Sequence, residues 1–323
     1  MNEHATTTPR EPQRWRAWEI GLWVVLAVAP FVFTQHAALI NEIAILALFA
    51  LSLDLILGFA GIVSLGHAAF FGFGAYVAAL FAKHVMPDPL VGLVVATVLG
   101  AALGALTSPM IVRGTDLTRL MVTMGVALVL LELANKFDTL TGGADGLQGV
   151  VMGPLLGHFE FDLGARTASF YSLVVLFLVF LALRRVVHSP LGVSLQALRD
   201  NRLRVTAIGL SVQGRLALVY TLGAALAGTA GGLLAQTTGF ASLDVLEFHR
   251  SADVMLALII GGAGWLWGGL IGAIAFKLMH DILSSITPQY WTFWIGLILV
   301  VLMLVGRDRL FKPWTWWRGG VSK

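Results

Sequence analysis

Nine apolar runs, most of them close to the length of a membrane-crossing helix, alternate with short polar stretches along this chain. They lie near residues 20–34, 37–58, 67–82, 90–112, 119–134, 169–187, 216–237, 252–279 and 290–306. Roughly 20 apolar residues in helical conformation span the hydrocarbon core of a bilayer. The sequence therefore predicts an all-α polytopic integral membrane protein with about 8–10 transmembrane helices.

Charged side chains are scarce. They make up 12% of the 323 residues, where a soluble domain carries about 25%. Hydrophobic residues reach 58%, and the 36 glycines suit helices that pack closely. The absence of cysteine excludes disulfides, thiolate metal sites and cysteine nucleophiles. Basic residues lie between apolar runs and form no continuous basic face, so no nucleic-acid partner is expected.

The distribution of Lys and Arg predicts the orientation. No small-residue cleavage site follows the first run, which we interpret as an uncleaved span with a cytoplasmic amino terminus. We assign the stretches between runs to alternating sides of the membrane, starting from this cytoplasmic end. This places 16 of the 21 basic residues on the cytoplasmic side and 4 on the other, with Lys277 inside a run. This pattern predicts cytoplasmic tails at 1–17 and 307–323, flanking a transmembrane domain at 18–306.

One run must contain more than a single crossing. Three runs separate the basic stretch 184–215 from the basic tail, and an odd number of crossings cannot join two segments on the same side. The run 252–279 is interrupted by five glycines within residues 261–269. We expect a re-entrant hairpin or two short crossings there, because a broken helix at membrane depth needs protein or water around its freed backbone groups.

A second glycine-broken segment lies in the first half of the chain, and its Gly58-Phe59-Ala60-Gly61 is echoed at 261–264. Paired breaks of this kind are typical of a translocation path, although glycines also serve helix packing alone. His67 either contacts solute or caps the next half-helix, and the two tryptophans either line the path or wedge between helices. The candidate path residues are Gly61, Ser64, Gly66, His67, Gly262, Gly264, Trp265 and Trp267.

The loop 188–215 is predicted to contain a capped amphipathic helix. Ser189 is placed to cap it, Pro190 suits its first position, and Gly209 is placed to end it. Such a helix either lies on the lipid surface or docks a cytoplasmic partner.

Four blocks of sequence carry a family resemblance. They are Ser-Pro-Leu-Gly with Ala-Leu-Arg-Asp-Asn and Ala-Ile-Gly-Leu within 189–210, and the stretches 58–72, 141–147 and 261–272. Together they resemble the branched-chain amino-acid ABC transporter permease family, in particular its LivM-type membrane subunit. Departures at 203–206, 113–119 and Arg215 leave the exact substrate open.

The resemblance implies a subunit of an ATP-driven importer for branched-chain or related small amino acids in the bacterial inner membrane. Its implied partners are a second homologous permease, two cytoplasmic ATPases and an extracytoplasmic solute-binding protein. The solute-binding protein would contact the external loops 135–168 and 238–251. The implied ATPase-coupling residues are Leu195, Leu198, Arg199, Asp200, Asn201, Ile208 and Gly209.

Catalytic motifs do not occur in the sequence. It contains no phosphate-binding Gly-x-x-x-x-Gly-Lys-Ser/Thr loop, no paired-histidine metal helix and no Gly-x-Ser-x-Gly elbow. We therefore expect no enzymatic activity, no metal and no cofactor in this chain, and ATP bound by the partner ATPases.

Ionisable residues within the runs support an alternative function. A charge at the bilayer centre costs about 2.5–3.5 kcal/mol on insertion scales, so each such residue is a functional candidate. Glu42, Asp54, Glu132 and Lys277 qualify, with Asp253 and Asp281 nearer the ends. The alternative is a gradient-driven transporter or channel in which the acids titrate or bind cations. These acids could instead sit at interfaces or pair with backbone, and a non-transporting partner subunit also fits.

Overall fold

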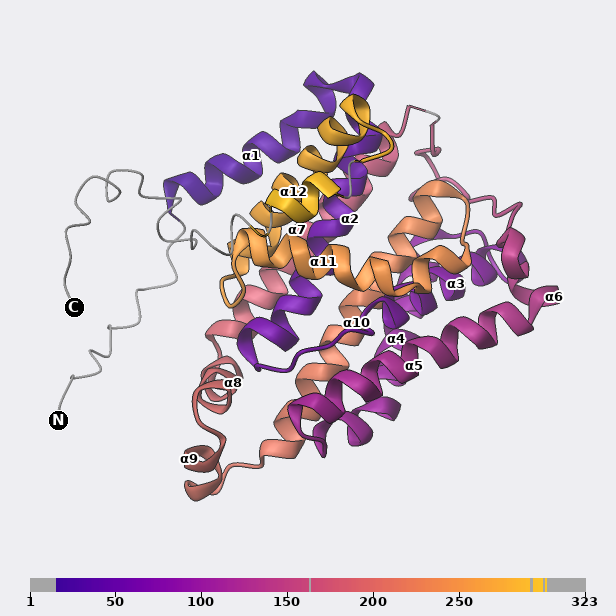
Figure 1. Ribbon diagram of the computed structural model, residues 1–323. Helices are drawn as coiled ribbons and strands as arrows, with labels where there is room; N and C mark the ends of the chain where they lie inside the picture. Colours follow the sequence, from indigo (N-terminus) through magenta and orange to yellow (C-terminus); the bar gives the residue numbers. More distant parts are fainter. Residues whose placement is uncertain (1–15, 163, 291–292, 299, 301–323) are drawn as a thin grey trace.

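The computed structural model describes residues 16–162, 164–290, 293–298 and 300. Figure 1 labels the α-helices; in the element names used here, η denotes a 3₁₀ helix or, for η2, a π-helix. The helices are α1 (Ala17–Val32), η1 (Thr34–His36), α2 (Ala37–Asp54), η2 (Leu55–Phe59), α3 (Ala68–His84), α4 (Pro89–Val112), α5 (Asp116–Lys136), α6 (Asp138–Thr141), η3 (Gly143–Asp145), α7 (Arg166–His188), α8 (Pro190–Asp200), α9 (Arg202–Ala207), α10 (Val212–Thr238), η4 (Leu243–Leu246), α11 (Phe248–Gly261) and α12 (Leu266–Ile286). In this part of the chain β-pairing is limited to two isolated bridges, so the predicted all-α class is confirmed.

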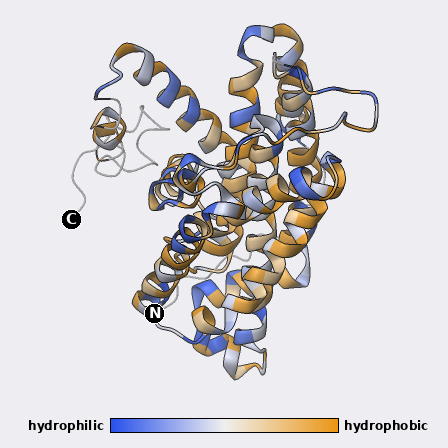
Figure 2. Cartoon of the chain, turned by 90° about the vertical axis from the view of Figure 1, so that its right-hand side faces the viewer, coloured by the Kyte–Doolittle hydropathy of each residue, from blue (hydrophilic) through white to orange (hydrophobic). Residues whose placement is uncertain are grey.

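The helices match the apolar runs closely. Within the described ranges, six helices are long and apolar enough to cross a membrane, and α1 and α3 are shorter apolar helices. The first seven runs each contain one of these eight helices, and the eighth contains the remaining one, α12, together with α11. Figure 2 shows hydrophobic residues along the long helices and hydrophilic residues mainly at helix ends and connections. The chain is therefore a polytopic membrane protein, as predicted. Most of the last run, and the tails at 1–15 and 307–323, lie outside the described residues.

Helix α10 lies at the centre of the molecule and packs through small residues. A Cβ atom on Gly231 would lie 1.7 Å from the carbonyl oxygen of Phe71 in α3. One on Gly74 of α3 would lie 2.2 Å from the carbonyl oxygen of Gly228. The same Gly228 meets Gly100 of α4, so α10 is in close contact with both neighbours. Close backbone approach through small residues is how membrane helices gain packing contacts.

Local sequence explains where these helices begin and end. Asp88 caps α4, because its carboxylate accepts hydrogen bonds from the N–H groups of Leu90 and Val91. Ser211 caps α10 in the same manner, by accepting from the N–H of Gly214. Helix α10 ends at Gly239, whose φ of +65° suits a residue without a Cβ.

The run 252–279 holds two helices, α11 and α12, that pack side by side and are joined by the expected glycine break. A Cβ on Gly261 of α11 would lie 1.8 Å from the carbonyl oxygen of Gly268 of α12. Helix α12 has 21 residues, or about 32 Å, whereas α11 has 14, or about 21 Å. Helix α11 is thus shorter than the hydrocarbon core of a bilayer, which is about 30 Å thick. It begins inside the bundle, where Ser251 accepts a hydrogen bond of 2.8 Å from the N–H of Ala68 in α3.

Helices α8 and α9 lie together at one corner of the molecule, between the ends of α7 and α10 (Figure 1). The far end of α10, at Thr238, lies 26 residues from its start at Val212. At 1.5 Å per residue, about 40 Å separate the two ends. We call the α8–α9 side the loop end and the opposite side the far end.

Candidate functional site

The first glycine-broken segment is a real interruption. Helix α2 passes into the π-helix η2, and residues 60–67 are not helical before α3 begins at Ala68. Gly61 has a φ of +68°, which favours glycine. Gly66 lies against the middle of α5, where a Cβ would come within 1.8 Å of the Thr123 carbonyl oxygen. Both glycines are therefore required by the local backbone path.

The second break is the turn between α11 and α12, and it meets the first. Gly262 and Gly264 have φ values of +97° and +82°. The N–H of Gly264 donates a hydrogen bond of 2.6 Å to Oδ1 of Asp54, in the last turn of α2. A Cβ on Gly58 would lie 2.3 Å from the same nitrogen. The two similar Gly-x-Ala-Gly blocks, about 200 residues apart in sequence, thus touch at the loop end.

Arg199 of α8 contacts both breaks. Its Nη1 donates a hydrogen bond to the carbonyl oxygen of Gly58. A Cβ on Gly264 would lie 2.8 Å from this Nη1, and one on Gly61 would lie 2.8 Å from Cγ of Arg199. The structure therefore brings together one predicted coupling residue and two predicted path residues.

The expected single helix at 189–209 is wrong, because two helices occupy the segment. Helix α8 ends at Asp200, and Asn201 has extended backbone angles. The Asn201 side chain then caps α9 by accepting from the N–H of Arg204 at 3.1 Å. Gly209, with a φ of +79°, follows the end of α9 as predicted.

The apolar residues of this loop face in two directions. Leu195 and Leu198 are fully buried against the chain's own core. Leu203 and Ile208 are exposed, at 83% and 72%. Asp200 is exposed beside Arg199, with 3.7 Å between Nε and Oδ1. Of the predicted apolar coupling residues, only Ile208 is available to an external partner. The exposed Leu203 was missed.

His67 is a buried polar residue whose ring packs against Phe49 and Phe70. Its ring stacks on Phe49 at 5.4 Å, and Phe49 meets Phe71 at 4.5 Å. Its Nε2 lies 2.8 Å from Oγ of Ser52, whose hydroxyl donates to the Phe49 carbonyl. Ser52 thus accepts from Nε2–H, and Nδ1 is left as an acceptor.

Five buried side-chain polar atoms find no hydrogen-bond partner among the described residues: Oδ2 of Asp54, Oγ of Ser64, Nδ1 of His67, Nε1 of Trp23 and the hydroxyl oxygen of Tyr76. The first three lie at or near the first glycine break. Such atoms are rare in folded proteins, and each calls for an explanation such as a water or a ligand.

The two tryptophans of the second break pack against neighbouring helices. Trp267 is buried among Trp18 and Trp23 of α1 and Phe180 of α7, at ring distances of 4.9, 6.2 and 4.6 Å. Trp265 is half-exposed and lies 6.3 Å from Trp18. This geometry corresponds to wedging between helices, the second of the two roles considered for them.

A polar cavity of about 500 Å³ lies towards the far end of α10, between α2, α3, α10, η4, α11 and α12. Its apolar wall includes Ile45, Leu46, Phe49, Phe71, Leu234, Phe240, Val245 and Phe276. Its polar wall includes Glu42, Thr238, Ser242, Asp244, Arg250, Asp253, Lys277 and His280. By contrast, a cavity of about 530 Å³ between α1 and α7 has only apolar lining residues. Of these two, only the first offers charged groups to a solute.

Two ion pairs stand in this cavity wall. Lys277 of α12 pairs with Glu42 of α2. Arg250 of α11 pairs with Asp244 of η4, its Nε and Nη2 lying 3.0 and 2.5 Å from Oδ2. Asp253, one turn beyond Arg250, makes no direct ion pair with the described residues, although Arg250, His249, His280 and Lys277 act on it electrostatically.

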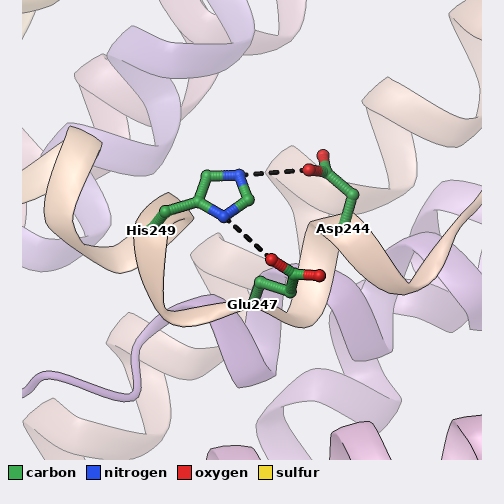
Figure 3. A group of neighbouring side chains, drawn as sticks. All are labelled: Asp244, Glu247 and His249. Carbon is green, nitrogen blue, oxygen red and sulfur yellow. Dashed lines mark hydrogen bonds and ion pairs between the residues drawn. The ribbon is translucent and has the colours of Figure 1, made fainter. Parts of the chain in front are cut away.

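Asp244 also belongs to a small cluster with Glu247 and His249, shown in Figure 3. The two ring nitrogens of His249 lie 3.1 Å from the carboxylates of Asp244 and Glu247. Three ligand atoms within 4.8 Å of one another could in principle hold a metal ion. The Arg250 guanidinium on Asp244 opposes a divalent cation by like-charge repulsion, so the cluster fits a hydrogen-bonded network better.

None of the eight predicted path residues lines the cavity. Its charged lining instead includes Glu42, Asp253 and Lys277, which the sequence indicated only as ionisable residues within or near apolar runs. Arg250 and Asp244 were missed, because they lie in a predicted external loop where charges are ordinary. The other ionisable candidates, Glu132 and Asp281, are exposed.

Glycine-broken membrane helices, a polar cavity at one end and a helical loop at the other define a membrane transport protein of the permease class. The family described as branched-chain amino acid transport system / permease component matches residues 36–305. The chain belongs to this family.

Individual relatives agree. The chain is 28% identical to the LivM permease protein of the high-affinity branched-chain amino acid transport system of Escherichia coli K12, covering 90% of this chain and 74% of the relative. It is 27% identical to LivM of Salmonella typhimurium, with the same coverage. It is 23% identical to LivH of Escherichia coli K12, covering 80% and 88%. No solved structure matches the chain significantly.

Proposed function

We propose that this chain is a membrane permease subunit of an ATP-driven ABC importer for branched-chain or related small amino acids. The contacts of Arg199 carry the proposal. This side chain extends from α8 to both glycine breaks. Helix α2 ends at the first break, and helix α12 begins at the second. The same two helices line the cavity with Glu42 and Lys277. A movement of α8 is thereby transmitted to the cavity through two rigid helices.

In this proposal, helices α8 and α9 dock a cytoplasmic ATPase. Leu195 and Leu198 hold α8 to the permease, and Leu203 and Ile208 are the outward apolar anchors. A helix docked in a groove is held by such anchors. Asn201 and Gly209 set the angle of α9, because they form its two ends.

The solute path runs from the cavity past Phe49 and Phe71 towards the loop end. Support comes from the unsatisfied atoms of Ser64, His67 and Asp54, which offer a polar solute or water hydrogen bonds along that route. The segment 60–67, with Gly61 and Gly66, is not helical, so its backbone groups in the same region lie outside a helical hydrogen-bond ladder. In this scheme Trp267 holds the second break in position by packing against α1 and α7.

The proposed assembly contains a second homologous permease, two ATPases that bind ATP, and an extracytoplasmic solute-binding protein. The last would dock on the loops 135–168 and 238–251, which are joined by the bridge between Leu147 and Ala241. We place the protein in the bacterial inner membrane with the loop 188–215 and both termini in the cytoplasm. It would have no cofactor and no catalytic residue of its own.

Reconstitution tests the proposal against its rival. Proteoliposomes with the complete assembly, binding protein outside and ATP inside, should accumulate L-leucine only when ATP is hydrolysed. Vesicles containing this chain alone should accumulate none under a proton or sodium gradient. Gradient-driven uptake by the chain alone would establish the secondary transporter instead.

A further inference from the structure

The charges of the far-end cavity do not balance. Three carboxylates, on Glu42, Asp244 and Asp253, face two permanently cationic groups, on Lys277 and Arg250, and the titratable ring of His280. Two of the carboxylates are engaged in ion pairs with these bases. The third, on Asp253, makes no direct ion pair with the described residues, although Arg250, His249, His280 and Lys277 act on it electrostatically. Beside the apolar half of the wall, this carboxylate in excess of the permanent cations attracts a cationic group.

We propose that the cavity is a binding site for a zwitterionic α-amino acid with an apolar side chain, in which Asp253 accepts the solute's ammonium group. The inference rests on the proposed function, and it adds that the permease itself recognises the solute.

The neighbour of Asp253 on the same helix supplies the opposite charge. Arg250 lies three residues earlier in α11, so the two side chains project from one face of the helix, about 5–6 Å apart at Cβ. Arg250 donates its Nε–H and one Nη2–H to the carboxylate of Asp244. A guanidinium has five N–H donors, so donors remain for a solute carboxylate. The ammonium and carboxylate of an α-amino acid are separated by one carbon atom and match this spacing.

The remaining wall fits an apolar side chain. Phe49, Phe71 and Phe276 bring aromatic rings into the cavity, and Ile45, Leu46 and Val245 add aliphatic surface. Burying a leucine-sized side chain on such surface is favourable, because apolar surface is removed from water. Phe49 is also the ring on which His67 stacks, so the apolar end of the solute would contact the ring that separates the cavity from His67.

Other ligand classes fit less well. An inorganic anion is opposed by the surplus carboxylate. A divalent cation is opposed by Arg250 and Lys277, which stand beside the available oxygens. A neutral solute gives Asp253 no partner, although a carboxylate in an apolar wall is costly without one.

The experiment measures binding of radiolabelled L-leucine to the purified permease, in the full-length chain with its second permease subunit and without binding protein. Asp253→Asn should weaken binding at least about ten-fold, because a charge-assisted hydrogen bond is lost. Asp253→Glu keeps a carboxylate and should retain part of the affinity for L-leucine. Asp281→Asn is the matched control, since Asp281 is exposed on α12 outside the cavity. 4-Methylpentanoate, which lacks the ammonium, should not compete.

Equal binding by the wild type and Asp253→Asn, competition by 4-methylpentanoate, or no binding by the wild type would each overturn the inference. Monodisperse elution of Asp253→Asn with its partner confirms that it is folded. Because this assay uses no ATP, it is independent of the uptake assay. A wild type that binds L-leucine but shows no ATP-driven uptake would overturn the proposed function and leave the binding site standing.

Discussion

The backbone N–H of Gly264 donates a hydrogen bond of 2.6 Å to the carboxylate of Asp54, and so joins the turn before α12 to the last turn of α2. Asp54 is fully buried. The two residues belong to opposite halves of the chain, so this bond is one of the contacts that hold the two glycine breaks together.

Replacing Asp54 by alanine should destabilise the protein by about 1–3 kcal/mol, because the N–H of Gly264 loses its partner in a buried position. Asp54→Asn should cost less, since an amide oxygen can accept the same bond. Thermal unfolding in detergent measures both. Asp281→Ala, on an exposed carboxylate, serves as the control. An Asp54→Ala protein that melts like the wild type would show that this bond contributes nothing.

Arg199→Ala should uncouple ATP hydrolysis from transport. The substitution removes the side chain that links α8 to both breaks, while leaving the exposed face of α9 intact. The number of ATP molecules hydrolysed per leucine taken up should rise about five-fold or more, the scale of a typical coupling energy. Arg185→Ala is the matched control, because Arg185 is exposed at the end of α7. Unchanged stoichiometry in Arg199→Ala would argue against the coupling role.

Substitutions at two leucines of the loop should have different effects, one on ATPase binding and the other on stability. Leu203→Asp changes an exposed residue, so the permease should fold normally but bind the ATPase at least about ten-fold more weakly, as at an interface hot spot. Leu198→Ala creates a cavity in the core and should cost about 2–5 kcal/mol of stability. Size-exclusion profiles and ATPase co-purification separate the two outcomes. If Leu203→Asp co-purifies with the ATPase as the wild type does, α9 is not the docking surface and a lipid-facing role is favoured.

Glycines in the packed helices should differ sharply in their tolerance of alanine. Gly231→Ala places a Cβ 1.7 Å from the Phe71 carbonyl oxygen and should cost about 1–3 kcal/mol through overpacking. Gly125→Ala, in α5, meets nothing within 4 Å and should gain up to about 1 kcal/mol from helix propensity. Melting temperatures in detergent test both. Equal temperatures for the two variants would contradict the close approach of α3 and α10.

Much of the fold is predictable from local sequence. Helix α4 follows from a long apolar run after the Asp88-Pro89 start signal, and the split between α11 and α12 follows from glycines at 261–264. The boundary at Asn201 was not predicted. An amphipathic stripe continues across it, and a cap within a run of polar residues gives only a weak signal.

The candidate site was less accessible to sequence reasoning. Glycine-rich blocks indicated where the chain bends, and those bends do meet at Arg199. The cavity lies elsewhere, because it forms where the short helix α11 begins inside the bundle between longer neighbours. Its charges come from α2, η4, α11 and α12, and no periodicity relates residues so far apart along the chain.

The sequence by itself determined that this chain crosses a membrane many times, where most spans lie, and which two segments are broken. Run length, glycine position and loop charge act locally, so they can be read along the chain. Only the tertiary structure decided that Leu198 faces the core while Leu203 faces outward, and that Asp253 shares a cavity with Lys277 and Glu42. An apolar stripe or a charge shows that a side chain needs a partner, and helix packing determines which partner it has.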